Sequence, residues 1–181
     1  MLTELQARKL LKLFCMYDGD RDGTVISQDF ERIADKLAEI KDLRGRSAKC
    51  LLLKDKFSQA WKQLVKKADS SHDQKVSLEE WLAYYSNVLT DETQYAKEVQ
   101  SLMTFIFEVF DDNGDGQISQ QEWTELFRVY GIHPVYAPIA FQQIDANQDG
   151  FISREELTEL IDDFFFGDNI DSVANSMFGP Y

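Results

Sequence analysis

A pattern of 12 residues occurs four times in this chain of 181 residues, and it constrains the fold more than any other feature. Its two most regular copies span residues 111–122 and 145–156. Both have Asp at positions 1 and 5, Asn at position 3, Gly at position 6, Ile at position 8 and Glu at position 12. Average composition gives a random window a chance on the order of 10⁻⁵ of meeting such constraints. Two copies 34 residues apart are therefore not accidental.

The spacing of the oxygen-bearing side chains matches the needs of a calcium ion. Ca²⁺ is a hard cation that takes about 6–8 oxygen ligands at about 2.3–2.6 Å. A loop of this kind supplies side chains from positions 1, 3, 5 and 12 and a backbone carbonyl from position 7, while Gly at position 6 permits a sharp left-handed turn. We prefer this interpretation to an acidic turn that only caps a helix. The expected ligands are Asp111, Asn113, Asp115, Gln117 and Glu122 in the third copy, and Asp145, Asn147, Asp149, Phe151 and Glu156 in the fourth.

The first copy, residues 18–29, is a variant. Its expected ligands are Asp18, Asp20, Asp22, Thr24 and Asp29. Asp29 replaces Glu at position 12 and is one methylene shorter, so it binds through one oxygen or requires the next helix to move inward. A site with one oxygen fewer is closer to the octahedral geometry that Mg²⁺ accepts. We expect a bound metal here, Ca²⁺ or Mg²⁺, in preference to a solvated acidic turn.

The second copy, residues 69–80, leaves two interpretations open. Its candidate ligands are Asp69, Ser71, Asp73, Lys75 and Glu80. Gln74 stands at position 6, where a non-glycine residue in the left-handed region costs roughly 1 kcal/mol or more. Ser71 is an uncharged and weaker ligand. This loop is either a weak metal site or a structural partner of the first loop, so the sequence predicts three calcium sites and leaves a fourth open.

A serine at position 9 accompanies the position-12 glutamate in three of the four loops. Ser77, Ser119 and Ser153 each precede a Glu by three residues. This S-x-x-E box typically starts a helix, because the Ser and the Glu exchange hydrogen bonds with each other's backbone. The first loop has Ile26 at the same place. We therefore expect the helix that carries Asp29 to start differently from the other three.

Apolar residues recur at i, i+3 and i+4 on both sides of every loop, which is typical of amphipathic helices. Ile139, Phe141 and Ile144, for example, form the expected stripe before the fourth loop. The predicted fold is all-α, with eight helices in four helix–loop–helix units. These units form two pairs, residues 1–90 and 91–181, within one compact globule. The aliphatic residues at position 8 should join paired loops through a short β contact.

The tail of the chain, residues 168–181, follows the last predicted helix. Gly167 provides the stop that a return of the chain requires. We expect this tail to fold back on the core and to bury Val173, Met177 and Phe178.

The acidic composition follows from the loops. The chain has 32 acidic and 19 basic residues, with a formal net charge of −13. Thirteen carboxylates are expected metal ligands, so the remainder of the chain is balanced. Without metal these carboxylates repel one another, and the protein should be looser. We see no basic patch that could neutralise phosphates, which argues against nucleic acid as a partner.

Other features exclude further classes of function. No stretch approaches the ~20 apolar residues of a membrane span. The opening residues lack an apolar signal core, and Leu2 excludes myristoylation, so we expect no membrane partner and a cytoplasmic location. Cys15 and Cys50 should be buried, reduced thiols. Two histidines and two cysteines form no catalytic arrangement, which indicates that the chain is not an enzyme.

The four loops begin at residues 18, 69, 111 and 145. Their ligand pattern resembles the EF-hand, and their unequal spacing resembles the sarcoplasmic calcium-binding protein family, including calerythrin-like members and the coelenterazine-binding proteins. It does not resemble the even spacing of calmodulin. Asp29 and the chain end, residues 161–167 and 177–181, support the match. The resemblance covers the whole chain and implies a compact four-hand protein, in a family whose second hand often loses its calcium.

Three functions fit a chain of this kind. They are an intracellular calcium buffer that opens little, a calcium sensor that regulates a protein partner, and a calcium-triggered carrier of an apolar small molecule. A sensor exposes an adaptable, Met-rich groove. This chain has 4 Met against 13 Phe, 7 Tyr and 3 Trp, and rigid aromatic side chains suit a fixed core. We therefore predict a monomeric buffer of Ca²⁺ and Mg²⁺, with no specific support for a protein partner or an apolar ligand.

Overall fold

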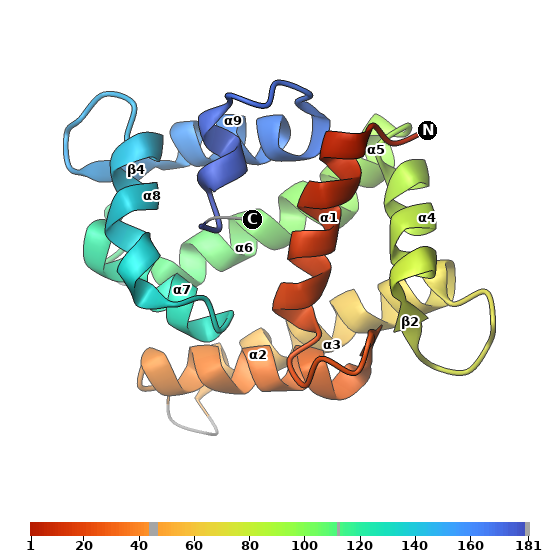
Figure 1. Cartoon of the computed structure of the whole chain (residues 1–181). Helices are drawn as coiled ribbons and strands as arrows, with labels where there is room; N and C mark the ends of the chain where they lie inside the picture. The colour runs from red at the N-terminus through yellow and green to blue at the C-terminus, as the bar shows by residue number, and fades with distance from the viewer. Residues whose placement is uncertain (44–46, 112, 180–181) are drawn as a thin grey trace.

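The computed structural model describes residues 1–43, 47–111 and 113–179, and it consists mainly of helices (Figure 1). The first half contains α1 (Glu4–Tyr17), α2 (Ser27–Ile40), α3 (Ala48–Ala68) and α4 (Leu78–Val88). The second half contains α5 (Glu92–Tyr95), α6 (Ser101–Phe110), α7 (Gln120–Val129), α8 (Ala137–Ile144) and α9 (Arg154–Phe166). A π-helical turn, Ala96–Gln100, joins α5 to α6 without a break, so the described residues form the eight predicted helices.

The S-x-x-E boxes start α4, α7 and α9 as predicted. In each box the Ser hydroxyl accepts a hydrogen bond from the Glu N–H at 3.2–3.3 Å. The Glu carboxylate accepts from the Ser N–H at 2.8–3.0 Å. Ile26 has no side-chain oxygen, but the Asp29 carboxylate accepts from the Ile26 N–H at 3.1 Å. α2 therefore starts with half of the box.

Short antiparallel strands join the loops in two pairs. β1 (Thr24–Val25) pairs with β2 (Val76–Ser77), and β3 (Gln117–Ser119) pairs with β4 (Phe151–Ser153). The position-8 residues lie opposite each other in the register, and all four are buried: Val25 with Val76, and Ile118 with Ile152. This arrangement confirms the predicted fold class of paired helix–loop–helix units with β contacts between their loops.

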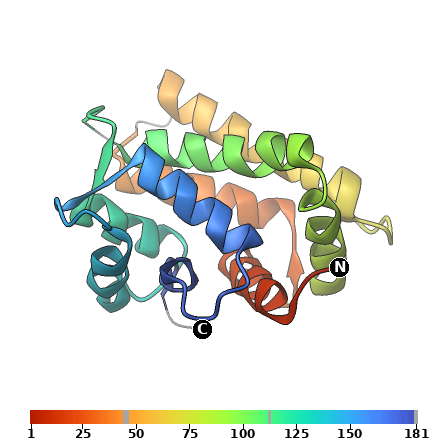
Figure 2. The ribbon, with the colours of Figure 1, turned by 90° about the horizontal axis from the view of Figure 1, so that it is seen from above.

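One hydrophobic core includes residues from both halves of the chain. The ring of Tyr17 on α1 lies 6.0 Å from that of Tyr130, which follows α7. The ring of Tyr85 on α4 stacks on Phe165 of α9 at 5.7 Å. Figure 2 shows α6 and α9 side by side with helices of the first half around them. Because these contacts cross residue 90, the division into units 1–90 and 91–181 stays a prediction.

A buried lysine also ties the halves together. α9 ends at Phe166, with the predicted stop residue Gly167 as its C-cap. Lys9 of α1 donates hydrogen bonds to the carbonyls of Asp163 and Gly167 at 3.1 and 2.7 Å. A cation at a helix C-terminus interacts favourably with the helix dipole. Burial lowers the pKa of Lys9, while the charges of Asp163 and Asp168 raise it. The first helix thus caps the last one.

The tail returns to the core, although not with every side chain that we predicted. Met177 and Phe178 are buried, in agreement with the expectation. Val173 is 48% exposed, so the prediction for this residue was wrong. A 3₁₀ turn begins at Val173 and directs Ala174 into the core instead. Residues 180 and 181 of the predicted tail lie outside the described residues.

Two other side chains that we expected to be buried are exposed. Ile139 is 57% exposed, because α8 starts at Ala137 and packs through Ala137, Ala140, Phe141 and Ile144. Cys15 is exposed on α1, although Cys50 is buried as expected. In both cases the neighbouring helices, which the sequence does not show, decide which face is covered.

The charge of α3 departs from the expectation that the chain has no basic patch. This helix carries six lysines, all exposed, and one acidic residue, Asp55. The net charge of −13 for the whole chain conceals this local excess of lysines. Within the described ranges, no helix is both long and apolar enough to cross a membrane.

Candidate metal centres

The first Asp of each loop organises the turn through its backbone. In the first loop, Asp18 accepts hydrogen bonds from the N–H groups of Asp22 at 3.1 Å and Gly23 at 3.0 Å. The same two bonds, from positions 5 and 6 to position 1, occur in the other three loops at 2.9–3.3 Å. All four loops therefore curl around the carboxylate at position 1.

The side chains at positions 3 and 5 lie within the same turn. The position-5 carboxylate accepts from the N–H at position 7 in every loop, at 2.8–2.9 Å. The position-3 oxygen accepts from the N–H at position 5 in the first, third and fourth loops, at 2.8–3.3 Å. In the second loop the Ser71 hydroxyl instead donates to Asp69 at 3.1 Å. The second loop thus differs at position 3, as its uncharged ligand led us to expect.

Left-handed backbone occurs at two positions of each loop. Position 6 has φ of 85° at Gly23, 80° at Gly116 and 88° at Gly150, and Gln74 has φ of 65°. Gln74 therefore carries the steric cost that we predicted for a non-glycine residue. Position 4 is also left-handed, and only the third loop has a glycine there, at Gly114. The sequence analysis did not predict the left-handed backbone at position 4. Gly114 in the third loop was the one residue that indicated it.

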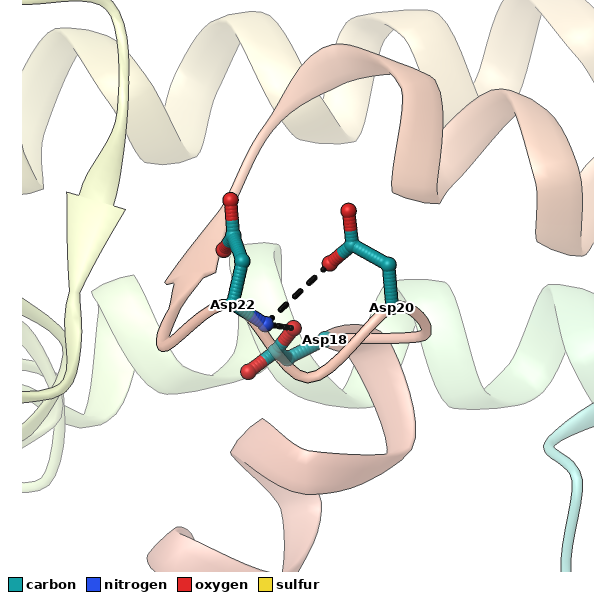
Figure 3. A group of neighbouring side chains, drawn as sticks. All are labelled: Asp18, Asp20 and Asp22. Atoms are coloured by element: carbon teal, nitrogen blue, oxygen red, sulfur yellow. Dashed lines mark hydrogen bonds between the residues drawn. The ribbon is translucent and has the colours of Figure 1, made fainter.

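Three carboxylates gather in the first loop. One oxygen from each of Asp18, Asp20 and Asp22 lies within 4.8 Å of the others (Figure 3). Asp18 is buried, and the other two are exposed. The hydroxyl and the N–H of Thr24 lower the pKa of Asp22. Oxygen donors without nitrogen or sulfur suit a hard cation such as Ca²⁺ or Mg²⁺.

Asp29, on α2, closes the first loop. It lies beside the side chain of Arg32, which the sequence analysis did not connect with this site. Its two oxygens accept from the N–H groups of Gly19 at 3.2 Å and Ile26 at 3.1 Å. Burial raises the pKa of Asp29, while these N–H groups and Arg32 lower it. The Arg32 guanidinium lies 3.7 Å from Asp29 and donates to the Tyr17 carbonyl at 2.8 Å. A fixed positive charge here opposes metal binding in the first loop.

Glu80 closes the second loop with both oxygens already engaged. One accepts from the N–H groups of Ser70 at 3.0 Å and Ser71 at 3.1 Å. The other accepts from the N–H and the hydroxyl of Ser77 at 3.0 and 2.9 Å. Hydrogen bonds from Ser77, followed by those from Ser71 and Ser70, lower the pKa of Glu80 to about 2. A metal in this loop has to compete with these internal bonds.

The fourth loop has a position-12 carboxylate with a free oxygen. Glu156 accepts from Ser153 through Oε2 at 2.9 Å. In the part of the chain that the structure describes, Oε1 of Glu156 has no hydrogen-bond partner. Asn147 also donates to Asp149 at 3.0 Å, as Asn113 does to Asp115 at 2.7 Å in the third loop. The roles of all these residues as metal ligands, including the carbonyls of Thr24, Lys75, Gln117 and Phe151, stay predictions.

Comparison with known proteins agrees with this geometry. A family model described as EF hand matches residues 102–127 and 139–161, the two hands with regular loops. A sarcoplasmic calcium-binding protein of Perinereis vancaurica tetradentata is 30% identical over 178 residues, which cover 98% of this chain and 99% of that protein. Calerythrin of Saccharopolyspora erythraea is 28% identical over 169 residues, 92% of this chain and 96% of calerythrin. The solved structure of a sarcoplasmic calcium-binding protein from amphioxus covers 100% of both chains, with a TM-score of 0.76 at 21% identity.

Proposed function

The chain belongs to the sarcoplasmic calcium-binding protein family, and from this premise we propose that it is a monomeric cytoplasmic buffer of Ca²⁺ and Mg²⁺ without enzymatic activity. Calcium occupies the first, third and fourth loops, and the second loop binds weakly or not at all. Magnesium competes at the first loop, where Asp29 replaces Glu. The names of the sarcoplasmic relatives support the cytoplasmic location.

The shared core is the observation that carries this proposal. A sensor must open a hydrophobic groove when calcium binds, and Met side chains usually line such grooves. Here Met16 and Met177 are buried, at 5% and 3% exposure, and Phe178 of the tail packs against Phe164 at a ring distance of 5.3 Å. Because the apolar faces of the hands already cover one another, calcium binding tightens the protein without opening it.

Calorimetric titration with calcium, with and without millimolar magnesium, tests the proposed sites. Wild-type protein should bind three ions firmly, and magnesium should weaken one of these sites. Glu122→Gln and Glu156→Gln should each remove one site, because each loses a chelating carboxylate. Glu159→Gln, which makes the same change of charge at an exposed residue of α9 that is no predicted ligand, is the matched control. A wild-type number of sites in either Gln variant would overturn the assignment.

A carrier of an apolar molecule requires a cavity for that molecule. A cavity of about 230 Å³ opens between α3, α4 and α6, and its lining includes Trp81, Tyr84 and Phe105. Its volume is below the roughly 300–1,000 Å³ of ligand pockets. A larger cavity of about 650 Å³ lies beside the second loop, but polar and charged side chains such as Asp73, Lys75 and Glu80 line it, so it does not suit an apolar molecule. Both observations favour the buffer over the carrier. Mass spectrometry of an organic extract of the purified protein distinguishes them. A stoichiometric apolar molecule in the extract would favour the carrier.

A further inference from the structure

α3 has a charge opposite to that of the rest of the chain. Six of the 19 basic residues lie on this helix, with one of the 32 acidic residues. Its core-facing residues are all apolar or small: Cys50, Leu53, Phe57, Trp61, Leu64 and Ala68. The lysines therefore occupy the face and flanks that point away from the core. Figure 2 shows α3 along the outer edge of the molecule, at the top of the view.

Most of these lysines have no acidic partner. Lys54 pairs with Asp35 at 2.6 Å, and Lys67 pairs with Glu98. Over residues 1–43, 47–111 and 113–179, no carboxylate lies within ion-pair distance of the other four lysines, which are Lys49, Lys56, Lys62 and Lys66. The ammonium group of Lys56 lies over the ring of Phe105 on α6, 5.9 Å from its centroid. An acidic protein thus presents a helix on which Lys49, Lys62 and Lys66 have no acidic partner among the described residues.

Two leucines extend the same surface. Leu51 and Leu52 are 56% and 51% exposed, in the first turns of α3. They lie between the buried Cys50 and Leu53, so both side chains point outward. Adjacent exposed leucines beside unpaired lysines combine the two properties by which a helix binds an anionic bilayer: charge attraction and shallow apolar insertion.

We propose that the outward face of α3, defined by Lys49, Leu51, Leu52, Lys62 and Lys66, docks on an anionic lipid bilayer. Its charge complements the lipid head groups, and its two leucines enter the interface. Asp55 is the one exposed acidic residue of this helix. The cavity beside α3 is lined by Lys56 but by none of Lys49, Lys62 and Lys66. These three lysines therefore suit an extended anionic surface better than an acidic peptide held in that cavity. The proposal goes beyond the buffer function, because it places the calcium sites close to a membrane.

Calcium should favour this docking through charge alone. The chain carries a formal net charge of −13, and an anionic bilayer repels it as a whole. Each bound Ca²⁺ adds two positive charges without requiring α3 to move. Screening limits the repulsion from distant loops, since the Debye length is about 10 Å at 0.1 M salt. Docking should therefore strengthen with calcium and weaken with salt.

Co-sedimentation of the full chain with vesicles tests the proposal. One set of vesicles contains phosphatidylcholine alone, and the other contains equal parts of phosphatidylcholine and phosphatidylserine. We expect binding to the anionic vesicles only, at micromolar free calcium and low salt. The double variant Lys62→Glu/Lys66→Glu should lower the partition coefficient by about tenfold. Leu51→Ser/Leu52→Ser should weaken binding without changing the net charge.

The matched control is Arg8→Glu/Arg128→Glu, which has the same net charge but alters exposed residues on α1 and α7. Its binding to anionic vesicles should stay within about twofold of that of the wild-type protein. Equal losses in both double variants, equal binding to both vesicles, or no binding by wild type would overturn the proposal. Binding to polyglutamate through Lys62 and Lys66, without vesicle binding, would assign the face to an acidic protein instead. Calcium calorimetry on the same variants tests the buffer function separately.

Discussion

Gln74 in the second loop has a left-handed backbone, with φ of 65°, at the position where the other loops have glycine. The side chain costs roughly 1 kcal/mol in this conformation. Gln74→Gly should therefore raise the calcium affinity of the second loop, by about fivefold if the metal-free loop relaxes out of the turn. Calorimetry on a variant that also carries Glu122→Gln and Glu156→Gln isolates this loop from the two regular ones.

His72→Gly provides a parallel test, because it removes a second left-handed side chain of the same loop, with φ of 61°. It should also raise the affinity. If neither variant changes the affinity, the internal hydrogen bonds of Glu80 limit the site, and the turn does not. Gln74→Gly could instead raise the melting temperature of the metal-free protein and leave the calcium affinity unchanged. That result would mean that the left-handed turn at residue 74 is already formed without metal.

Asp29 determines the metal preference of the first loop. Asp29→Glu should raise the affinity for Ca²⁺ relative to Mg²⁺, by about tenfold if a second oxygen contributes about 1.4 kcal/mol. The reciprocal change, Glu156→Asp, should make the fourth loop more sensitive to magnesium. Calcium titrations at several magnesium concentrations measure both effects. Unchanged magnesium sensitivity in both variants would contradict the role that we assign to the length of this side chain.

Among the secondary-structure elements, the end of α2 makes a contact that joins the first hand to the third. Lys41 donates to the carbonyl of Phe110, the last residue before the third loop, at 3.2 Å. It also pairs at 2.8 Å with Glu125 on α7, and its side chain is only 4% exposed. Lys41→Met should lower the free energy of unfolding of the calcium-loaded protein by about 2 kcal/mol, because a charged hydrogen-bond network is lost.

Urea denaturation measures this loss, and Lys54→Met provides the control. Lys54 forms an ion pair with Asp35 at a similar distance, 2.6 Å, but the two side chains are 49% and 63% exposed. Exposed pairs contribute about 1 kcal/mol or less. Equal losses of unfolding free energy in the two variants would contradict the prediction that the buried contacts of Lys41 stabilise the protein more than an exposed ion pair does.

Local features of the elements were predictable, and contacts between elements were not. The Ser119 and Ser153 caps and the Ile118–Ile152 register follow from spacing within one loop or between two. The roles of Lys9 and Lys41 depend on helix ends more than 60 residues away in the chain. No local pattern distinguishes such a lysine from a surface one. The exposure of Val173 has a different cause, because the 3₁₀ turn that begins at this residue directs Ala174 into the core instead.

At the scale of the whole molecule, the core connects four acidic loops whose carboxylates repel one another without metal. Contacts such as Tyr85 with Phe165 and Lys9 with the end of α9 cross between the halves. Removing calcium should therefore loosen the halves together rather than unfold one hand. Loosened proteins expose apolar surface that binds hydrophobic dyes. A buffer of this kind therefore exposes apolar surface when metal is absent, whereas a sensor exposes it when calcium is bound.

Fluorescence of a hydrophobic dye during calcium addition tests this account most directly, with calmodulin, which opens a Met-rich groove, as the positive control. We predict that the fluorescence of the dye with this protein is highest without metal and falls as calcium fills the sites. The fluorescence with the Glu122→Gln/Glu156→Gln variant should fall less, because two of its calcium sites no longer form. A strong rise in fluorescence on calcium binding, as in calmodulin, would contradict the compact buffer and assign a sensor.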